Sequence, residues 1–157
     1  INTLLSEHGV ETSEKQGVSE VQLASMACPA LPTCGLSLAE SERYLPDLLG
    51  TVENLLDEGG LGDERVVLRM TGCPNGCTRP YMAELGFVGR SPNKYAVYLG
   101  GNEEGTRLAR LYDQNVKVDE IPEKIGGLFT RFRDERESKE RFGDFCARVV
   151  WPEQGVV

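Results

Sequence analysis

The stretch Thr71-Gly72-Cys73-Pro74-Asn75-Gly76-Cys77 contains two cysteines separated by three residues, which include a proline and a glycine. Upstream, Cys28 and Cys34 form a second pair, separated by five residues that include Pro29 and Pro32. Proline and glycine shape the turn of each short loop, while its backbone N–H groups stay free to bond to sulfur. A thiolate metal site needs this arrangement. The two loops therefore predict a metal centre, and the rest of the chain is the scaffold that brings them together.

Three kinds of site are consistent with two cysteine pairs. An iron–sulfur cluster held by Cys28, Cys34, Cys73 and Cys77 is the favoured interpretation. A structural zinc site is the first alternative, although zinc ribbons use spacers of about two to four residues and the first pair here has five. Plain buried thiols are the second. An odd number of cysteines without a secretion signal favours a reducing, cytoplasmic compartment, and hence thiolate ligands rather than disulfides.

Hydrophobic periodicity predicts one mixed domain of strands and helices around these loops. Pro46 is expected either to break the second helical segment or to begin a new helix, and Gly59-Gly60 to end it. The expected strands are Val21–Cys28, Val66–Met70, Ala83–Arg90 and Lys94–Gly100, the last two joined as a hairpin through Ser91-Pro92-Asn93, and Leu108–Val118. The expected helices are Ile1–His8, Leu36–Leu56, one turn at Thr78–Met82, Asp119–Arg141, and a short piece after Gly143 at Asp144–Val149. The polar stretch from Val10 to Glu20 is expected to be irregular.

In this arrangement each cysteine pair lies where a strand ends and a helix begins. Helix N-termini carry unpaired N–H groups and a partial positive charge. Both features lower the pKa of a nearby thiol and offset the negative charge of a thiolate-bound cluster. The sequence therefore predicts that two helix N-termini support the metal centre.

Composition limits the classes of partner. The chain has 157 residues and a formal net charge of −8, which argues against nucleic acid or an anionic membrane as partner. It contains no apolar run near the roughly 18 residues of a membrane span. Because it begins at Ile1, we expect a fragment of a longer protein. Residues 1–20 would be the tail of a preceding element, residues 21–150 the cluster-binding domain, and residues 151–157 a C-terminal tail.

Beyond the paired cysteines, the sequence resembles the sirohaem sulfite/nitrite reductase family, and within it the assimilatory sulfite reductase haemoproteins (the NADPH enzyme's β subunit), in their C-terminal part. The likeness runs from about Ser25 to Arg148 and covers most of the chain. It is carried by Met26-Ala27-Cys28, Pro32-Thr33-Cys34, Ala39–Arg43, Arg69–Cys77, Ala83–Gly89, Leu99–Asn102, Gly105–Arg107 and Phe142–Phe145.

The resemblance implies an α+β fold with a mixed sheet of about five strands flanked by helices, and a [4Fe–4S] cluster at the ends of the first two strands. It implies that Cys77 bridges the cluster to the iron of sirohaem and that the reaction is the six-electron reduction of sulfite to sulfide. Asn75 inside the motif is a further candidate for cofactor binding. Arg69 and Arg79 flank the motif and are candidates to meet sirohaem carboxylates, although a solvated surface position is the simpler role for both.

The same resemblance implies partners. Sulfite is the substrate, and electrons come from a flavoprotein subunit carrying FAD and FMN and oxidising NADPH, or from ferredoxin. The family takes most of its sulfite-binding and sirohaem-binding cations from its N-terminal half, so this chain offers no assignable catalytic residue and is expected to be inactive alone. His8 is the one histidine, which removes ordinary histidine acid–base catalysis, and Cys146 is expected to be a buried, inert thiol. A sirohaem nitrite reductase domain and a zinc-stapled or cluster-free interaction domain remain the alternatives.

Overall fold

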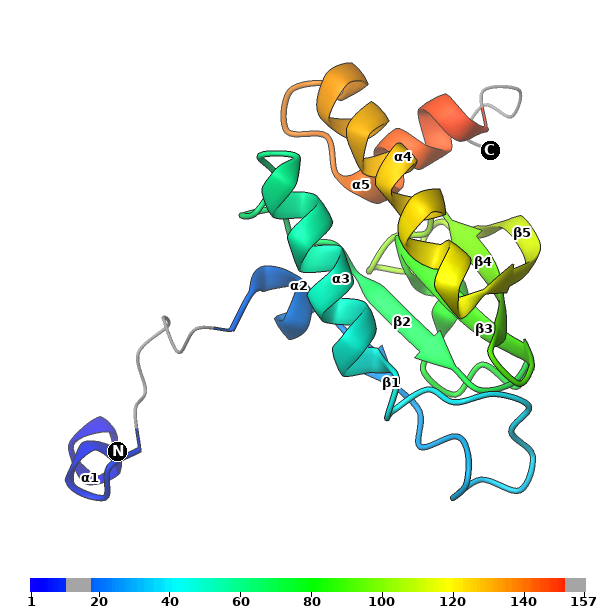
Figure 1. The fold of residues 1–157 in the computed structure, drawn as a ribbon. Coiled ribbons are helices and arrows are strands. Elements are labelled where there is room, and N and C mark those ends of the chain that lie inside the picture. The colour runs from blue at the N-terminus through cyan, green and yellow to red at the C-terminus, as the bar shows by residue number, and fades with distance from the viewer. Residues whose placement is uncertain (11–17, 152–157) are drawn as a thin grey trace.

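The computed structural model describes residues 1–10 and 18–151. Figure 1 shows the elements in chain order. The helices are α1 (Asn2–Glu7), α2 (Glu20–Leu23), α3 (Leu45–Glu58), α4 (Ile121–Glu135) and α5 (Phe142–Phe145). The strands are β1 (Met26–Ala27), β2 (Leu68–Thr71), β3 (Leu85–Ser91), β4 (Lys94–Leu99) and β5 (Arg110–Lys117). Short 3-10 helices occupy Pro80–Met82 (η1) and Val118–Glu120 (η2), and a π-helical turn covers Cys146–Val150 (η3).

The five strands form one sheet in the order β1-β2-β3-β4-β5. The first three are parallel, whereas β4 and β5 are each antiparallel to the preceding strand, so the expected mixed sheet of five strands is confirmed. The hairpin of β3 and β4 turns at Asn93, whose φ of 59° is the left-handed conformation that tight hairpin turns require. Because β1, β2 and β3 are parallel, their carboxyl ends lie at one edge of the sheet.

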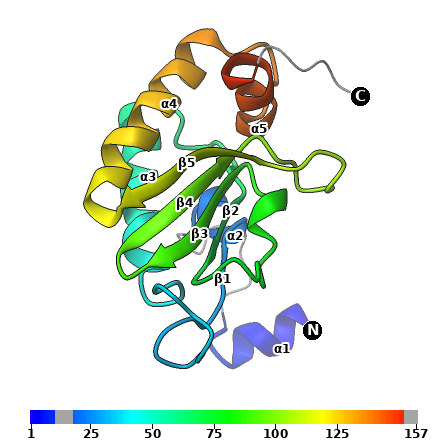
Figure 2. The same ribbon diagram turned by 90° about the vertical axis from the view of Figure 1, so that its right-hand side faces the viewer.

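Helices α3 and α4 cover one face of this sheet (Figures 1 and 2). Alternate strand residues point into the core beneath them, as the two-residue period of a strand dictates. The buried strand residues on this face include Leu68, Met70, Leu85, Phe87, Tyr95, Val97 and Leu99. The helices contribute Leu48, Leu49, Val52 and Leu56 from α3 and Ile121, Ile125, Leu128, Phe129 and Phe132 from α4. This core holds the sheet rigid, so its carboxyl edge can position a site.

The sheet face opposite α3 and α4 is covered in part by the segment that contains η1. Arg69 pairs in register with Met26 on one side and Gly86 on the other, and Gly86 pairs with Tyr98, so these four residues form one row across that face. The segment that ends in η1 lies on this row: a Cβ on Gly86 would stand 2.3 Å from the carbonyl oxygen of Pro80. This closeness is the reason that a glycine occupies position 86.

A buried carboxylate joins the sheet to the C-terminal segment. Glu84 is only 2% exposed and accepts four hydrogen bonds. The donors are the backbone N–H groups of Val67 and Gly143 and two nitrogens of the Arg141 guanidinium, at 2.8–3.1 Å. The pKa of Arg141 is raised, first by this hydrogen bond to Glu84. Glu84 therefore holds the starts of β2 and β3 against the turn that opens α5.

Several expected elements are wrong in detail. Val21 belongs to the short helix α2, which the Ser19 hydroxyl caps by accepting from the N–H of Gln22 at 3.1 Å, so the expected strand shrinks to β1. Residues 36–44 form no helix. Helix α3 begins at Leu45 with Pro46 in its first turn, where backbone N–H groups have no partner within the helix, so the missing N–H of proline costs no hydrogen bond. Helix α4 ends six residues before the expected Arg141, at Glu135, and α5 includes Gly143 instead of following it.

Other expectations are confirmed. The hairpin, the last strand and the first helical piece, which ends near Gly9 at a φ of 72°, all form. The irregular stretch expected from Val10 to Glu20 falls largely outside the described residues, as does most of the C-terminal tail. Within the described ranges, no helix has the length and apolar character that crossing a membrane would require.

Candidate metal centre

The two cysteine loops leave the same edge of the sheet. Cys28 follows the last residue of β1 directly, and Cys73 lies two residues beyond the end of the adjacent parallel strand β2. The N–H of Cys28 donates to the carbonyl of Met70 at 3.2 Å, which continues the strand pairing up to the cysteine. The N–H of Gly72 donates to Cys28 Sγ at 3.3 Å. A sulfur of the first pair is therefore hydrogen-bonded by the loop that carries the second.

Gly72 fixes the contact between the loops. Its carbonyl accepts from the N–H groups of Leu38 and Ala39, at 2.8 and 3.0 Å, so the first loop folds back over the second after Cys34. A Cβ at position 72 would stand 1.9 Å from Ser37 Oγ and 2.6 Å from the Ala39 carbonyl oxygen. The Ala39 oxygen belongs to the loop backbone, and the Ser37 hydroxyl donates a hydrogen bond to it. The close approach of the two cysteine loops thus requires glycine here.

Two buried hydroxyl groups also hold the cysteine loops at the end of β2. Ser41 and Thr78 both donate to the carbonyl oxygen of Met70, at 2.8 and 3.0 Å. Ser41 comes from the chain after the first cysteine pair, and Thr78 follows the second pair directly. The Thr71 hydroxyl also donates to the carbonyl of Cys73 at 3.1 Å. Sequence reasoning missed Ser41, Thr78 and Gly72, because these contacts join residues up to 44 positions apart and no local pattern marks them.

The structure joins the two cysteine loops at Cys28 and Gly72 but exposes the four thiols unequally. Cys28 and Cys73 are buried, Cys34 is partly buried and Cys77 is exposed, and all four are free thiols. Among the described residues, no three histidine, cysteine or acidic side chains are grouped closely enough to hold a single metal ion. A zinc site requires four ligands at about 2.0–2.3 Å from one ion. A four-iron cluster gives each cysteine an iron of its own, so its thiolates stand farther apart and suit the loops better.

The expected electrostatic support from helix N-termini is wrong for both pairs. The chain after Cys34 is a loop until α3 begins at Leu45, and the chain after Cys77 forms only the three-residue helix η1. Neither is a helix terminus beside a cysteine. Among the described residues, the support observed at a cysteine sulfur is the N–H of Gly72, which donates to Cys28 Sγ.

The three flanking polar candidates lie in different settings. Asn75 and Arg79 are exposed, and Arg79 has a φ of 56°, a left-handed conformation uncommon outside glycine. Arg69 is only 7% exposed, so the expected surface position is wrong for it. Burial lowers the pKa of Arg69, the charge of Arg79 lowers it further, and Glu103 opposes the shift. The sequence could not show this burial, because an arginine in a strand gives no sign that a distant segment will cover it.

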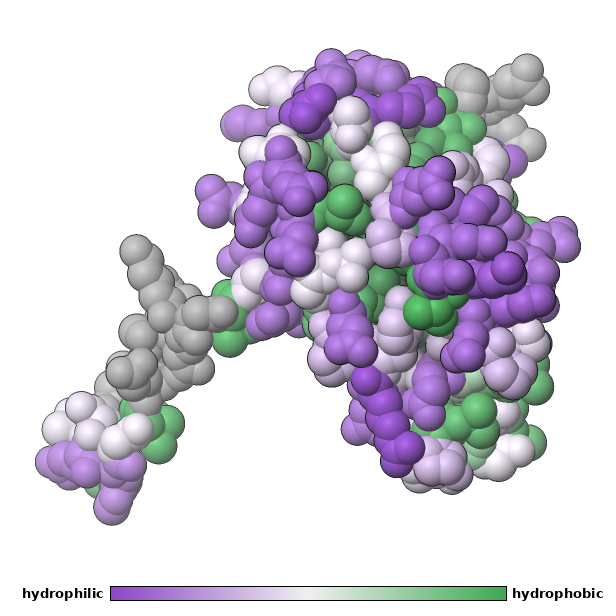
Figure 3. Space-filling view, viewed as in Figure 1, coloured by the Kyte–Doolittle hydropathy of each residue, from purple (hydrophilic) through white to green (hydrophobic). Residues whose placement is uncertain are grey.

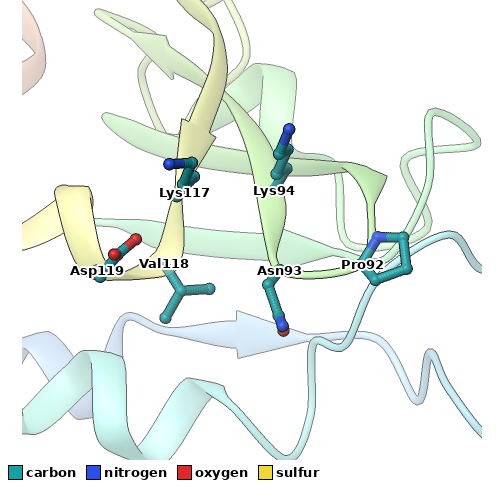
Figure 4. Close-up of a pocket in the computed structure, with 6 residues that line it drawn as sticks. All are labelled: Pro92, Asn93, Lys94, Lys117, Val118 and Asp119. Atoms are coloured by element: carbon teal, nitrogen blue, oxygen red, sulfur yellow. The ribbon is translucent and has the colours of Figure 1, made fainter.

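Other candidate groups lie elsewhere. Cys146 is fully buried, as expected, and this burial raises the pKa of its thiol. The glycine-bearing segment from Gly100 to Arg107 is a turn closed by backbone hydrogen bonds. A pocket of about 460 Å³ opens at the β3–β4 turn (Figure 4). Its lining contains no cysteine and consists of Pro92, Asn93, Lys94, Lys117, Val118 and Asp119.

Hydrophobic side chains are exposed beside the first cysteine pair. Leu36 and Leu38 are 71% and 43% exposed, respectively, in the loop that folds over Gly72. Figure 3 shows hydrophobic surface at the lower end of the molecule, where Figure 1 places this loop. Exposed apolar residues gathered at one end of a molecule mark a contact surface. The loop of the first cysteine pair therefore exposes two leucines, whereas the loop of the second pair exposes Asn75 and is followed by exposed Arg79.

Comparisons with known proteins show which proteins the chain is similar to. A sulfite reductase [NADPH] hemoprotein beta-component of Bacillus pumilus is 50% identical over 95% of the chain. A sulfite reductase [ferredoxin] of Synechococcus elongatus is 52% identical, also over 95%. The solved structure of the Mycobacterium tuberculosis NirA protein superposes with a TM-score of 0.72 at 26% identity, over 94% of this chain and 28% of that one. No protein-family model matches the chain.

The relatives are much longer than the chain, which spans 26% of the Bacillus protein and 24% of the Synechococcus protein. The similarity includes the whole described sheet and both cysteine loops, since it extends over 149 of the 157 residues. Sequence and fold agree on the same group of proteins. The chain is therefore homologous, over nearly its whole length, to a segment that makes up about a quarter of the sulfite reductase hemoproteins.

Proposed function

We propose that Cys28, Cys34, Cys73 and Cys77 hold one [4Fe–4S] cluster and that this chain is the cluster-bearing part of an enzyme that reduces sulfite to sulfide. The observation that carries the proposal is the junction of the two loops, where the N–H of Gly72 donates to Cys28 Sγ at 3.3 Å. Homology to sulfite reductase hemoproteins supports the choice of reaction.

The unequal exposure of the four thiols supports a shared ligand. Cys28 and Cys73 are buried in the protein, whereas Cys77 is exposed beyond the second loop. A thiolate that also reaches the iron of a sirohaem has to face outward, toward the space in which the tetrapyrrole lies. We therefore assign the bridge to Cys77, and Asn75, exposed in the same loop, is the polar group beside it.

When bound, the cluster and sirohaem supply the electron transfer and the open iron position that sulfite reduction needs. The chain's own residues act by holding the ligands. Ser41, after the first cysteine pair, and Thr78, after the second, both donate to the Met70 carbonyl and so tie both loops to β2. The Gly72 N–H stabilises negative charge on Cys28 Sγ, an interaction that raises a cluster's reduction potential. The buried positions of Cys28 and Cys73 keep water from these two sulfurs.

The remainder of the reaction belongs to groups outside this chain. A sulfite dianion and a tetrapyrrole with several carboxylates require converging arginine and lysine side chains. This chain carries a net charge of −8, so we assign the sulfite-binding and proton-donating residues to the N-terminal half of the longer protein. The 157-residue chain is then inactive toward sulfite by itself.

The electron donor is either a flavoprotein that oxidises NADPH or ferredoxin, because the names of close relatives specify one or the other. Five free cysteines suit a reducing compartment, which is the basis for placing the protein in the cytoplasm. A sirohaem nitrite reductase is the second candidate. The comparison of kcat/KM for sulfite and nitrite, measured on the full-length protein, decides between the two substrates.

The cofactor proposal is tested on the chain itself. After anaerobic incubation with iron and sulfide, the expected product has a broad visible absorption band that disappears on reduction, and Cys34→Ser lacks it. Subsequent addition of sirohaem is expected to give new haem bands in the wild-type chain and not in Cys77→Ser. A colourless chain that binds zinc with high affinity would instead identify a zinc-stapled domain.

A further inference from the structure

Tyr81 is a side chain outside the cysteine motif that reaches back to the second cysteine loop. It lies in η1, after the second cysteine pair, and its hydroxyl donates to the carbonyl oxygen of Pro74 at 3.2 Å. Pro74 is the first residue of the spacer between Cys73 and Cys77. The hydroxyl of Tyr81 is therefore bonded to the backbone that leads from one cysteine of the pair to the other.

The ring of Tyr81 packs against the same spacer. Gly76 has a φ of 66°, and a Cβ built on it would stand 3.0 Å from Tyr81 Cε2 and 3.6 Å from Cδ2. The ring thus fills the side of the turn that only a glycine leaves open. Hydroxyl and ring contact the spacer at two different residues, Pro74 and Gly76, and two contacts fix the orientation of a short loop better than one.

The rest of Tyr81 is held by the sheet. Its ring meets the ring of Tyr98 in β4 edge to face, with the centroids 5.0 Å apart and 86° between the ring planes, a favourable aromatic geometry. Its backbone carbonyl accepts from the N–H of Ala109, just before β5, at 2.7 Å. Because both of these neighbours belong to the sheet or its connections, Tyr81 joins the spacer to the rigid part of the domain.

The hydrogen bond within the spacer's own turn is weak. The N–H of Gly76 reaches the carbonyl oxygen of Cys73 at 3.4 Å, which is long for a backbone hydrogen bond. The hydroxyl of Thr71 holds the Cys73 end, and the N–H of Arg79 donates to the Gly76 carbonyl at 2.8 Å beyond the turn. Cys77 is exposed at the end of this turn. The direction of an exposed thiol is set by the backbone that carries it, so support for the spacer is support for Cys77.

We infer that Tyr81 is a positioning residue for Cys77: its hydroxyl and ring hold the Pro74–Gly76 spacer in the conformation that directs the Cys77 thiolate outward. This inference rests on the proposed function in one respect, which is that Cys77 is the thiolate shared with the sirohaem iron. Tyr81 acts through the backbone of the spacer. Removal of a group that orients a metal ligand typically costs about 10–100-fold in metal affinity or activity.

Three variants separate the hydroxyl, the ring and general packing. Tyr81→Phe removes the hydroxyl that bonds to Pro74 and keeps the ring. Tyr81→Leu removes both and leaves an apolar side chain on the sheet. Tyr98→Phe is the matched control, because it removes the other hydroxyl of the same ring pair and leaves both rings in contact.

The first measurement is backbone hydrogen exchange of the cluster-free chain, resolved by mass spectrometry for a peptide that covers residues 73–79. Tyr81→Phe should raise the exchange rate of this peptide about two- to five-fold, because it loses one exposed hydrogen bond. Tyr81→Leu should raise it further, and Tyr98→Phe should match the wild type. A tyrosine that only packs on the sheet would instead lower the urea midpoint and leave the exchange of this peptide unchanged.

The second measurement uses the chain reconstituted with iron and sulfide. Tyr81→Leu should release iron to a chelator at least about ten-fold faster than the wild type. Tyr81→Phe, which keeps the ring against Gly76, should retain the full cluster content and bind added sirohaem about two- to five-fold more weakly. Tyr98→Phe should match the wild type in both respects.

The two measurements distinguish this inference from the proposed function. If the wild-type chain assembles no cluster, the proposed function fails, and hydrogen exchange still decides whether Tyr81 holds the spacer. If the cluster forms but takes up no sirohaem, the assignment of the bridge to Cys77 fails, and iron release decides. Wild-type exchange of residues 73–79 in both Tyr81 variants, or equal opening of the spacer in Tyr98→Phe, would overturn the positioning role.

Discussion

Substitution of Gly72 by alanine tests how the two cysteine loops meet. An added Cβ would stand 1.9 Å from Ser37 Oγ, 2.6 Å from the carbonyl oxygen of Ala39 and 2.7 Å from the Cβ of Ala30. The serine hydroxyl can rotate, but it would give up its 2.8 Å hydrogen bond to the carbonyl of Ala39. The Ala39 oxygen and the Ala30 Cβ can move only if the first loop moves. Gly72→Ala therefore forces the loops apart.

The magnitude follows from two contributions. Overpacking a tight site costs about 1–3 kcal/mol. The displaced loop also weakens the hydrogen bonds from Leu38 and Ala39 to the Gly72 carbonyl, each worth about 0.5–1.5 kcal/mol net. The free energy of unfolding should fall by about 2–5 kcal/mol. The matched control is Gly50→Ala in α3, where an added Cβ meets nothing within 4 Å and should stabilise the helix by about 0.5–1 kcal/mol.

The assay is urea unfolding monitored by circular dichroism, combined with iron and sulfide analysis after anaerobic reconstitution. Gly72→Ala should lose stability and bind less cluster even at low denaturant, because the displaced loops also weaken the hydrogen bond from the residue-72 backbone N–H to Cys28 Sγ. Gly50→Ala should bind the full amount. The reasoning is refuted if Gly72→Ala unfolds at the wild-type urea concentration and incorporates as much iron as the wild type.

Three further outcomes are expected. Cys34→Ser should abolish iron incorporation, whereas Cys146→Ala should keep it and lose only about 1–2 kcal/mol of stability, which iron analysis and urea unfolding check together. Glu84→Ala should cost about 3–5 kcal/mol, because four hydrogen bonds lose their acceptor; an unchanged thermal midpoint would contradict this. The hydrogen bond from Arg148 holds the pKa of Glu140 below its ordinary value of 4.5. That stabilisation is present above about pH 4.5 and is lost as the pH falls through the lower folded-state pKa, so Glu140→Gln should flatten the fall in stability on acidification.

The cysteine pairs and most strands could be predicted because their signals are local. The hairpin of β3 and β4 follows from two apolar runs around Pro92-Asn93, and β2 from the compact run that leads into Cys73. These predictions needed only alternation, turn residues and spacing. The position of the cysteine loops at the ends of the first two strands was implied by the family resemblance, and the parallel pairing of β1 and β2 puts both strand ends at one edge of the sheet.

The remaining features depend on contacts between distant residues. Leu36, Leu38 and Ala39 have helical spacing, but the N–H groups of Leu38 and Ala39 donate to Gly72 instead of to carbonyls four residues earlier. Ala39 is fully buried in this loop, whereas both leucines remain exposed, so their periodicity does not reflect a helix face. Arg69 was misplaced for the same reason, because the segment that covers it follows the second cysteine pair. Tertiary packing overrode local preference at the positions next to the site.

The most direct test of the cluster assignment is the iron and sulfide content of the purified chain after anaerobic reconstitution, with each of Cys28, Cys34, Cys73 and Cys77 changed to serine in turn. The wild-type chain should contain about four iron and about four sulfide ions, the content of one [4Fe–4S] cluster. Each single variant should lose the intact cluster. A wild-type chain that binds one metal ion and no sulfide, or that keeps its cluster without Cys34 and Cys77, would contradict the account.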